Sequence, residues 1–303
     1  MSAARAGTGG TAVPRPAPAA LNRPVSELRG LRYTAPALLW TCVFFVVPFA
    51  LMALASVSTK VSGETVLTWS LGEYADFFAR PHLRQALWNS LEITATVTLI
   101  SILIAWPFAW TLATVVPERW QRFALVIAIV PFWTSYVVRS YAWLLVLAKN
   151  GLLNKALMGA GLISTPLEIA ATRVATVTGF VHFFTMLLTL TIWANLKQLS
   201  PNYARAAADL GAGAFATFRL VILPLTLPGV MVGAFLTFVL CLGDYITPEI
   251  LGGGNELVLP QLIMTQIERR ADFPAASAMS LILMGVVTLA WLASARWLKL
   301  DRA

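Results

Sequence analysis

Charged side chains are scarce in this sequence. Asp, Glu, Lys and Arg together make up 12% of the residues, whereas a soluble domain carries roughly 25%. Hydrophobic residues account for 58%. With so few charges available, much of the surface must face lipid rather than water, which argues against a chain built of ordinary soluble domains.

Cysteine and histidine are also rare, with two of each. Cys42 and Cys241 lie inside apolar runs and lack the spacing of a metal site or a redox pair, so we interpret both as packing residues. His182 lies in an apolar run and is expected to pack or to form an interhelical hydrogen bond, while His82 lies in a loop. We therefore expect no metal site and no catalytic residues.

A phosphate-binding loop of the form Gly-x-x-x-x-Gly-Lys-Ser/Thr is absent as well. Any ATP would have to be bound and hydrolysed by another chain, and we expect no cofactor here. The formal net charge is +8, but the basic residues flank apolar runs instead of forming a stripe with aromatics. This distribution argues against a nucleic-acid partner.

Long apolar runs are what the sequence has in abundance. About 20 apolar residues are needed for a helix to cross the hydrocarbon core, and six runs are long enough, of which the third contains one charge, Arg139. We expect an all-α, polytopic membrane protein with six transmembrane helices, because lipid-exposed backbone must satisfy its own hydrogen bonds. The six runs are Tyr33–Thr59, Ile93–Pro117, Phe123–Ala148, Val174–Leu196, Leu220–Gly243 and Phe273–Ala295.

Basic residues in the connections predict the orientation. They far outnumber acidic residues in the N-terminal segment, the second and fourth loops and the C-terminus, and are balanced by acids in the remaining loops. The positive-inside rule therefore places both termini in the cytoplasm. Residues 1–32, rich in Ala, Pro, Gly and Arg, are expected to form a disordered cytoplasmic tail, and residues 33–303 the membrane domain.

The connection between the fourth and fifth runs has strong local signals. Ser200 and Pro201 are typical of a helix start, and the alanine-rich stretch Tyr203–Leu210 should be helical. Gly211 follows where that helix should end, because glycine readily adopts the left-handed conformation. A second short helix is expected over Ala214–Ile222. The result would be two helices joined at a glycine corner on the cytoplasmic face.

This connection, residues 199–223, resembles the coupling loop of permeases from binding-protein-dependent, type I ABC importers. In that family the loop docks into a groove of a cytoplasmic ATPase. Arg205 stands where the family has glutamate, which implies either a compensating change on the ATPase or weaker coupling. The ATPase-coupling residues that the resemblance implies are Arg205, Ala206, Ala207, Asp209, Leu210, Gly211 and Ala212.

Three further segments carry the resemblance. Asn89-Ser90-Leu91 is similar to the opening of the second span in many such permeases. Two segments resemble the spermidine/putrescine permease group within that family: Pro131–Ser135 with Val138–Trp143, and Gly243–Pro248 with Leu251-Gly252-Gly253. The resemblance extends from Tyr33 to Trp297. It implies a permease in the bacterial inner membrane that works by alternating access. A polyamine is the favoured cargo, although relatives also carry iron, phosphonates, thiamine or opine-like compounds.

The same resemblance implies partners. We expect a second permease subunit, more often a different chain than a copy, two cytoplasmic ATPase subunits and an extracytoplasmic solute-binding protein. An ion-gradient-driven secondary transporter or channel is the alternative. That class typically has coupling carboxylates deep within spans and an inverted repeat, and the sequence has neither.

Ionisable residues within or beside the spans are candidates for the substrate path, because charge in a membrane is costly. Glu92 and Asp244 would offer negative charge to a cation arriving from outside, unless they lie at the interface or pair with Arg139. An aromatic face can also bind an alkylammonium group. The predicted path residues are Glu92, Trp133, Arg139, Asp244, Tyr245 and Thr247.

Overall fold

The computed structural model describes residues 27–254 and 257–298, so the predicted tail and the last five residues lie outside the described part, apart from the helical residues 27–32. The chain divides into two compact units, residues 1–51 and 52–303. α1 (Glu27–Thr41) and η1 (Cys42–Val46) belong to the first unit and lead directly into α2 (Val47–Ser56), which continues into the second unit. None of the apolar window of this first candidate span is buried, which is suited to lipid or to another protein.

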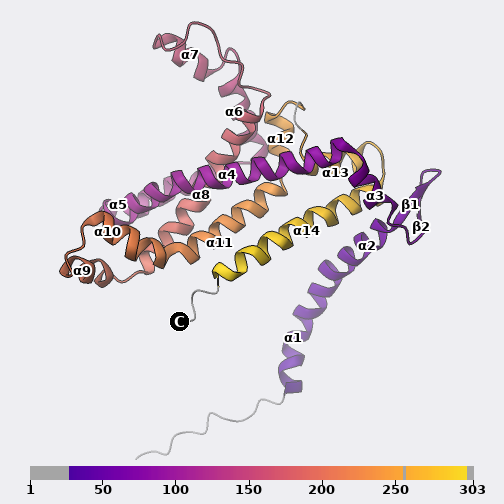
Figure 1. Ribbon diagram of the computed structural model, residues 1–303, viewed down its shortest axis with the longest axis horizontal. Helices are drawn as coiled ribbons and strands as arrows, with labels where there is room; N and C mark the ends of the chain where they lie inside the picture. The colour runs from indigo at the N-terminus through magenta and orange to yellow at the C-terminus, as the bar shows by residue number, and fades with distance from the viewer. Residues whose placement is uncertain (1–26, 255–256, 299–303) are drawn as a thin grey trace, which may run out of the picture. The chain divides into compact units, whose positions relative to one another are not determined.

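Four long helices form the body of the second unit (Figure 1). They are α4 (Pro81–Thr114), α8 (Arg173–Gln198), α11 (Leu223–Leu242) and α14 (Phe273–Leu298). α8 packs along α4, and α11 packs against α8, α4 and α14. One buried cluster joins Ala105 and Ala109 of α4 to Leu188 and Ile192 of α8 and to Val230 of α11.

Five helices in the described part of the chain are long and apolar enough to cross a membrane. They agree with the first, second, fourth, fifth and sixth predicted runs, except that α4 begins at Pro81 rather than near Ile93. Proline suits this position because the first turn of a helix needs no backbone donor. The count of six spans and the cytoplasmic location of both termini remain predictions.

The third predicted run is not one helix. It forms α5 (Glu118–Trp133) and α6 (Tyr136–Leu147), because Thr134 and Ser135 take extended backbone angles between them. Threonine and serine are weak helix formers, since their side chains compete for backbone hydrogen bonds. The expectation of one continuous helix through Arg139 is therefore wrong.

Among the shorter elements of the second unit, β1, β2, α3 and α13 lie at one end of the long helices, whereas α7 lies apart from them beyond α6 (Figure 1). β1 (Ser58–Val61) and β2 (Glu64–Leu67) form an antiparallel hairpin, a small exception to the all-α prediction. Its turn uses Ser62 and Gly63, both with positive φ, as a two-residue hairpin requires. The short helices are α3 (Gly72–Ala79), α7 (Leu152–Gly159), α12 (Ile246–Leu251) and α13 (Leu259–Glu268).

Two π-helical turns each lie just before a proline. In η1 the Val47 N–H donates to the carbonyl of Cys42, and Pro48 follows. In η2 (Phe218–Ile222) the Leu223 N–H donates to the carbonyl of Phe218, and Pro224 follows. Proline has no N–H, so the helix shifts its hydrogen bonding locally and continues through the proline.

Candidate functional sites

The predicted glycine corner is present. α9 (Asn202–Asp209) ends at Asp209, Leu210 is its C-cap, and Gly211 takes a φ of +81°. The N–H of Ala212 donates to the carbonyl of Ala207 at 3.0 Å, which closes the end of the helix in the manner of a Schellman motif. The predicted helix is thus confirmed to within a residue at each end.

The sequence predicted a separate short helix after the corner, but the structure has none. α10 (Ala214–Thr217), η2 and α11 form one continuous helical segment, Ala214–Leu242. The π-helical turn carries the helical backbone past Pro224 without a break, so α10 is directly continuous with α11. Phe218 fastens this segment to α4, because its ring lies edge-on to Trp106 at 5.1 Å and to Trp110 at 5.9 Å.

The corner exposes an unusual amount of apolar surface for a turn. The exposed fraction is 89% for Leu210 and 74% for Phe215. Arg205 is exposed beside them, and Ala207 is buried. Large exposed apolar side chains of this kind often mark a protein-binding surface. In Figure 1 the corner lies at one end of α4, α8 and α11, away from α3 and α13.

Two predicted path residues, Asp244 and Thr247, meet at a third side chain that sequence reasoning missed. The Tyr136 hydroxyl donates to Oδ2 of Asp244 and accepts from Oγ1 of Thr247 at 3.0 Å. Oδ1 of Asp244 accepts the N–H of Ile246 at 2.8 Å, which holds the start of α12. The only sequence signal for Tyr136 was its place between the two halves of a recognised motif.

The remaining predicted path residues are dispersed. The Arg139 guanidinium stacks over the rings of Tyr136 at 4.7 Å and Phe183 at 4.2 Å, next to the Asp244 cluster. Glu92 forms an ion pair with Arg173 at 2.8 Å, a partner that the sequence did not suggest. Trp133 has 87% of its surface exposed, and Tyr245 is half-buried without joining the cluster through any hydrogen bond among the described residues. The structure thus brings Arg139, Asp244 and Thr247 together around Tyr136.

An apolar cavity of about 640 Å³ opens between α4, α5 and α8. Its wall includes His182, Thr185 and Met186. His182 packs edge-on against Trp143, with ring centroids 5.4 Å apart, which agrees with the packing role expected for it. The cavity is too apolar to hold a charged group and too open to be a closed site.

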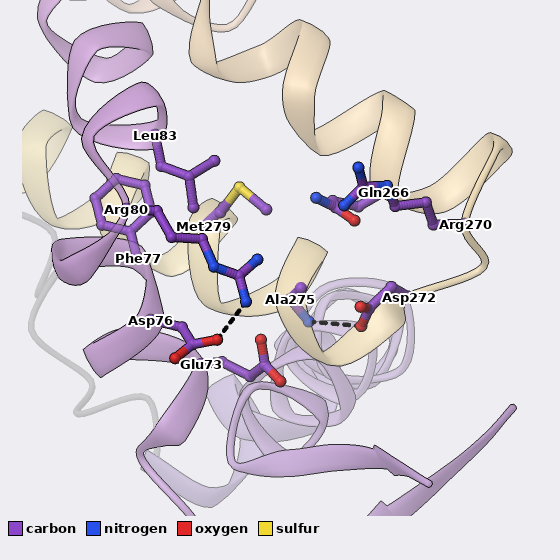
Figure 2. Close-up of a pocket in the computed structure, with 10 residues that line it drawn as sticks. All are labelled: Glu73, Asp76, Phe77, Arg80, Leu83, Gln266, Arg270, Asp272, Ala275 and Met279. Atoms are coloured by element: carbon purple, nitrogen blue, oxygen red, sulfur yellow. Dashed lines mark hydrogen bonds and ion pairs between the residues drawn. The ribbon is translucent and has the colours of Figure 1, made fainter. Parts of the chain in front are cut away.

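A second, polar pocket of about 100 Å³ lies where α3, α4, α13 and α14 meet (Figure 2). Its polar lining combines three acidic residues, two arginines and one amide: Glu73, Asp76, Asp272, Arg80, Arg270 and Gln266. Burial, together with the negative charges of Asp272 and Asp76, raises the pKa of the Glu73 carboxyl. The sequence had shown these acids only as balancing charges in the outer loops.

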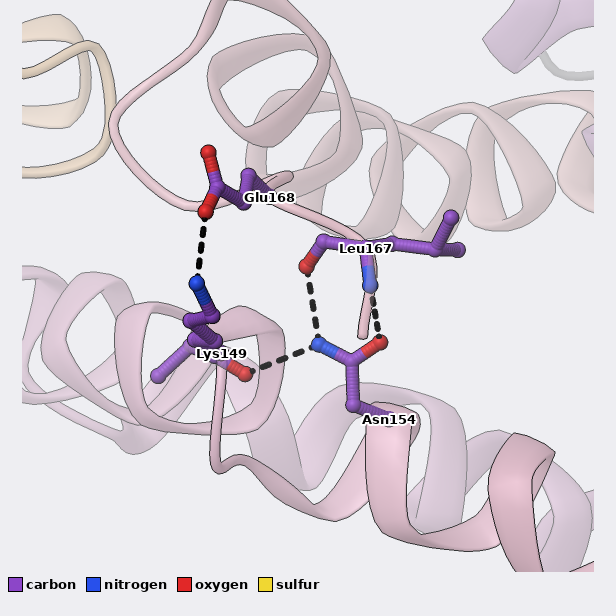
Figure 3. Close-up of polar contacts among 5 residues, drawn as sticks. Lys149, Asn154, Leu167 and Glu168 are labelled. Atoms are coloured by element: carbon purple, nitrogen blue, oxygen red, sulfur yellow. Dashed lines mark hydrogen bonds and ion pairs between the residues drawn. The ribbon is translucent and has the colours of Figure 1, made fainter. Parts of the chain in front are cut away.

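The buried side chain of Asn154 forms hydrogen bonds within the connection between α6 and α8 (Figure 3). The Asn154 amide donates to the carbonyl of Leu167 at 2.9 Å and accepts the Leu167 N–H at 2.8 Å. Nearby, Lys149 pairs with Glu168 at 2.8 Å on the surface, which lowers the pKa of the glutamate and raises the pKa of the lysine. These bonds join α7 to the residues that follow it in the chain.

Known proteins resemble this chain over most of its length. Residues 96–300 match the family model described as binding-protein-dependent transport system inner membrane component. The spermidine/putrescine transport system permease protein PotB of Haemophilus influenzae is 30% identical over 252 residues, which cover 82% of this chain and 87% of that protein. The inner membrane ABC transporter permease protein YdcU of Escherichia coli K12 is 32% identical over 214 residues, which cover 66% of this chain and 67% of that protein.

The fold also matches a solved structure. A chain of a bacterial alginate ABC transporter, crystallised with its pentasaccharide-bound periplasmic protein, superposes with a TM-score of 0.70 at 15% identity. The match covers 90% of this chain and 96% of that chain. At this identity the likeness concerns the fold alone.

Proposed function

Since this chain belongs to the family of binding-protein-dependent transport system inner membrane components, we propose that it moves a polyamine such as spermidine or putrescine into the cell. Membership makes it a multi-pass permease subunit of an ABC importer in the bacterial inner membrane. The cargo proposal rests on one observation, the 30% identity to PotB over 82% of this chain. The chemistry of the Asp244 cluster is consistent with a cationic cargo.

We propose that the α9–α10 corner is where ATP-driven work enters the permease. Leu210 and Phe215 present apolar side chains to a partner, and Arg205 presents a positive charge. The coupling surface would comprise Arg205, Ala206, Asp209, Leu210, Gly211 and Ala212, while the buried Ala207 supports it from within. Because α10 continues into α11, a displacement of the corner would tilt or shift a core helix of the bundle.

The same proposal includes three kinds of partner protein. Two ATPase subunits would bind and hydrolyse ATP, a second permease would complete the pathway, and an extracytoplasmic binding protein would deliver the solute. The second permease is proposed to be a different chain. The exposed first span, Tyr33–Ser56, is consistent with a membrane protein that buries further surface against a partner.

A cationic solute would meet the Asp244 cluster on its way through. In the observed conformation both carboxylate oxygens already accept hydrogen bonds, from Tyr136 and from the α12 backbone. A carboxylate has about four acceptor positions, so an ammonium group could bind Asp244 beside the Tyr136 hydroxyl or in its place. The cluster would then offer the cation one carboxylate, with the Arg139 guanidinium stacked on the Tyr136 ring beside it.

The test is uptake by the complete transporter reconstituted in liposomes with its co-purifying partners. We expect ATP-dependent uptake of labelled putrescine or spermidine, and no comparable uptake of thiamine or a phosphonate. Uptake of the amines should fall at least tenfold in Asp244→Asn, with the exposed Glu64→Gln as the matched control. Uptake that persists without ATP but requires an ion gradient would instead establish a secondary transporter, and uptake of a different solute would replace the polyamine.

A further inference from the structure

We propose that the polar pocket between α3, α4, α13 and α14 is a binding site for a primary ammonium group. The pocket joins residues from opposite ends of the chain around about 100 Å³ of space (Figure 2). This inference rests on the groups that line the pocket and not on the identity of the transported solute.

The lining of the pocket has three carboxylates and two arginines, Arg80 and Arg270, so negative charge exceeds positive charge by one. Asp76 forms an ion pair with Arg80 at 2.5 Å. Glu73 and Asp272 are the other two acids of the lining. Glu73 is half-buried, and the proximity of Asp272 and Asp76 disfavours its ionised form. A cation placed between Glu73 and Asp272 would relieve this repulsion.

A buried amide provides independent evidence for a missing donor. Gln266 is only 7% exposed, and its side-chain oxygen has no hydrogen-bond partner among the described residues. Figure 2 shows the Gln266 amide reaching into the same space that Arg80 and Met279 border. Buried polar atoms are nearly always paired, so an unpaired oxygen aimed into a pocket indicates a ligand that donates a hydrogen bond.

The lining fits an ammonium better than a metal ion. An ammonium has three N–H donors, which two carboxylates and one amide oxygen can accept. A calcium ion would need about six to eight oxygen ligands, and two arginines line the pocket, which disfavours a double positive charge. No cluster of three metal-ligating side chains occurs in the part of the chain that the structure describes.

The pocket also has an apolar wall for the carbon chain of an amine. Phe77, Leu83 and Met279 are buried side chains that pack together beside the polar groups. The volume accommodates an ammonium and one or two methylenes, and a longer amine would extend outward. The combination of three acceptors and an apolar wall selects a primary alkylamine over a hydrated inorganic cation.

The pocket and the α9–α10 corner lie at opposite ends of α4. Leu83 lies in the first turn of α4, whereas Trp106 and Trp110, near the other end of that helix, contact the corner segment through Phe218. The pocket therefore lies at the end of the bundle opposite the α9–α10 corner (Figure 1). With the corner facing the ATPase, the pocket faces outward. The ammonium group can belong to a free amine or to a lysine of a docked protein.

The test uses the full chain purified in its transporter complex in lipid nanodiscs, with n-propylamine as the probe and n-propanol as the uncharged comparison. We expect propylammonium to bind and to raise the thermal unfolding midpoint, whereas propanol should do neither. Glu73→Gln and Gln266→Leu should each weaken propylammonium binding at least tenfold. Glu64→Gln, an equal charge change on the exposed strand β2, should leave it unchanged.

Folding defects are distinguishable from loss of the site. Burial and nearby acids raise the pKa of Glu73 in the folded protein, so its ionised form lowers stability at neutral pH. Without amine, the Glu73→Gln variant should therefore have an unfolding midpoint equal to or above that of the wild type. Two results together would indicate that the ammonium group is a lysine of the binding protein. Free propylammonium would bind only above about 100 mM, and Glu73→Gln and Gln266→Leu would each weaken docking of the binding protein tenfold or more. If both variants bind the amine and the binding protein within twofold of the wild type, the proposal is wrong, whatever solute the transporter carries.

Discussion

At the residue scale, the most informative side chain is one without a charge. Tyr136 satisfies a carboxylate and a hydroxyl at once, since its O–H donates to Asp244 while its oxygen accepts from Thr247. Its ring also supports the guanidinium of Arg139. One phenol therefore links the break between α5 and α6 to the start of α12.

Replacing Tyr136 with phenylalanine should lower stability by about 1–3 kcal/mol, because it leaves a carboxylate oxygen of Asp244 without this donor in a partly buried site. The measurement is the thermal unfolding of the purified protein. Tyr141→Phe is the matched control, since Tyr141 lies in the same helix with 53% of its surface exposed. Equal effects of the two substitutions would mean that the hydrogen bond to Asp244 contributes nothing measurable.

At the element scale, the glycine corner connects a surface helix to a core helix. α9 ends because Gly211 adopts a backbone conformation that costs other residues about 1–2 kcal/mol. The next segment does not end before the membrane, since α10 and η2 continue into α11. The second arm of the corner is thus continuous with a core helix of the bundle.

Two glycines of the corner allow a controlled experiment. A Cβ at Gly211 or at Gly213 would meet no atom within 4 Å, but only Gly211 has a positive φ. Gly211→Ala should therefore distort the corner and reduce both ATPase co-purification and ATP-driven uptake several-fold, whereas Gly213→Ala should preserve both. If Gly211→Ala couples normally, or if both variants fail alike, the conformation of this corner does not govern coupling.

At the scale of the whole molecule, small residues allow the second unit to pack closely. Gly233 of α11 lies against Leu188 and Thr191 of α8, so an added Cβ would come within 3.1 Å of their side chains. Helices in membranes associate largely through such close packing, because lipid removes the hydrophobic driving force between them. The contact between α8 and α11 is therefore a main determinant of bundle stability.

Gly233→Leu should destabilise the second unit by about 1–3 kcal/mol or prevent its assembly, because it overpacks this contact. Gly285→Leu is the control: Gly285 lies within the long helix α14, where an added Cβ would meet nothing within 4 Å. Monodispersity in detergent and the thermal unfolding midpoint are the measurements. A normal midpoint for Gly233→Leu would show that the contact between α8 and α11 accommodates a larger side chain and that its close packing does not limit stability.

The helical spans and the corner could be read from the chain because local interactions determine them. A run of apolar residues predicts a span by its length alone, and Gly211 ends α9 through its own backbone freedom. The break between α5 and α6 was missed because the apolar run masked two weak helix formers, Thr134 and Ser135. The continuity of α10 with α11 was missed because a π-helical turn accommodates Pro224, and proline patterns do not distinguish a kink from a stop.

The sequence by itself determined that this is a membrane-embedded helical permease, and it located the surface proposed to meet the ATPase. Only the tertiary structure decided which polar residues act together. Tyr136 and Asp244 are 108 residues apart, and the pocket draws on residues from Glu73 to Met279. Contacts at such separations depend on how the helices pack, and the packing is a property of all the helices together rather than of any segment.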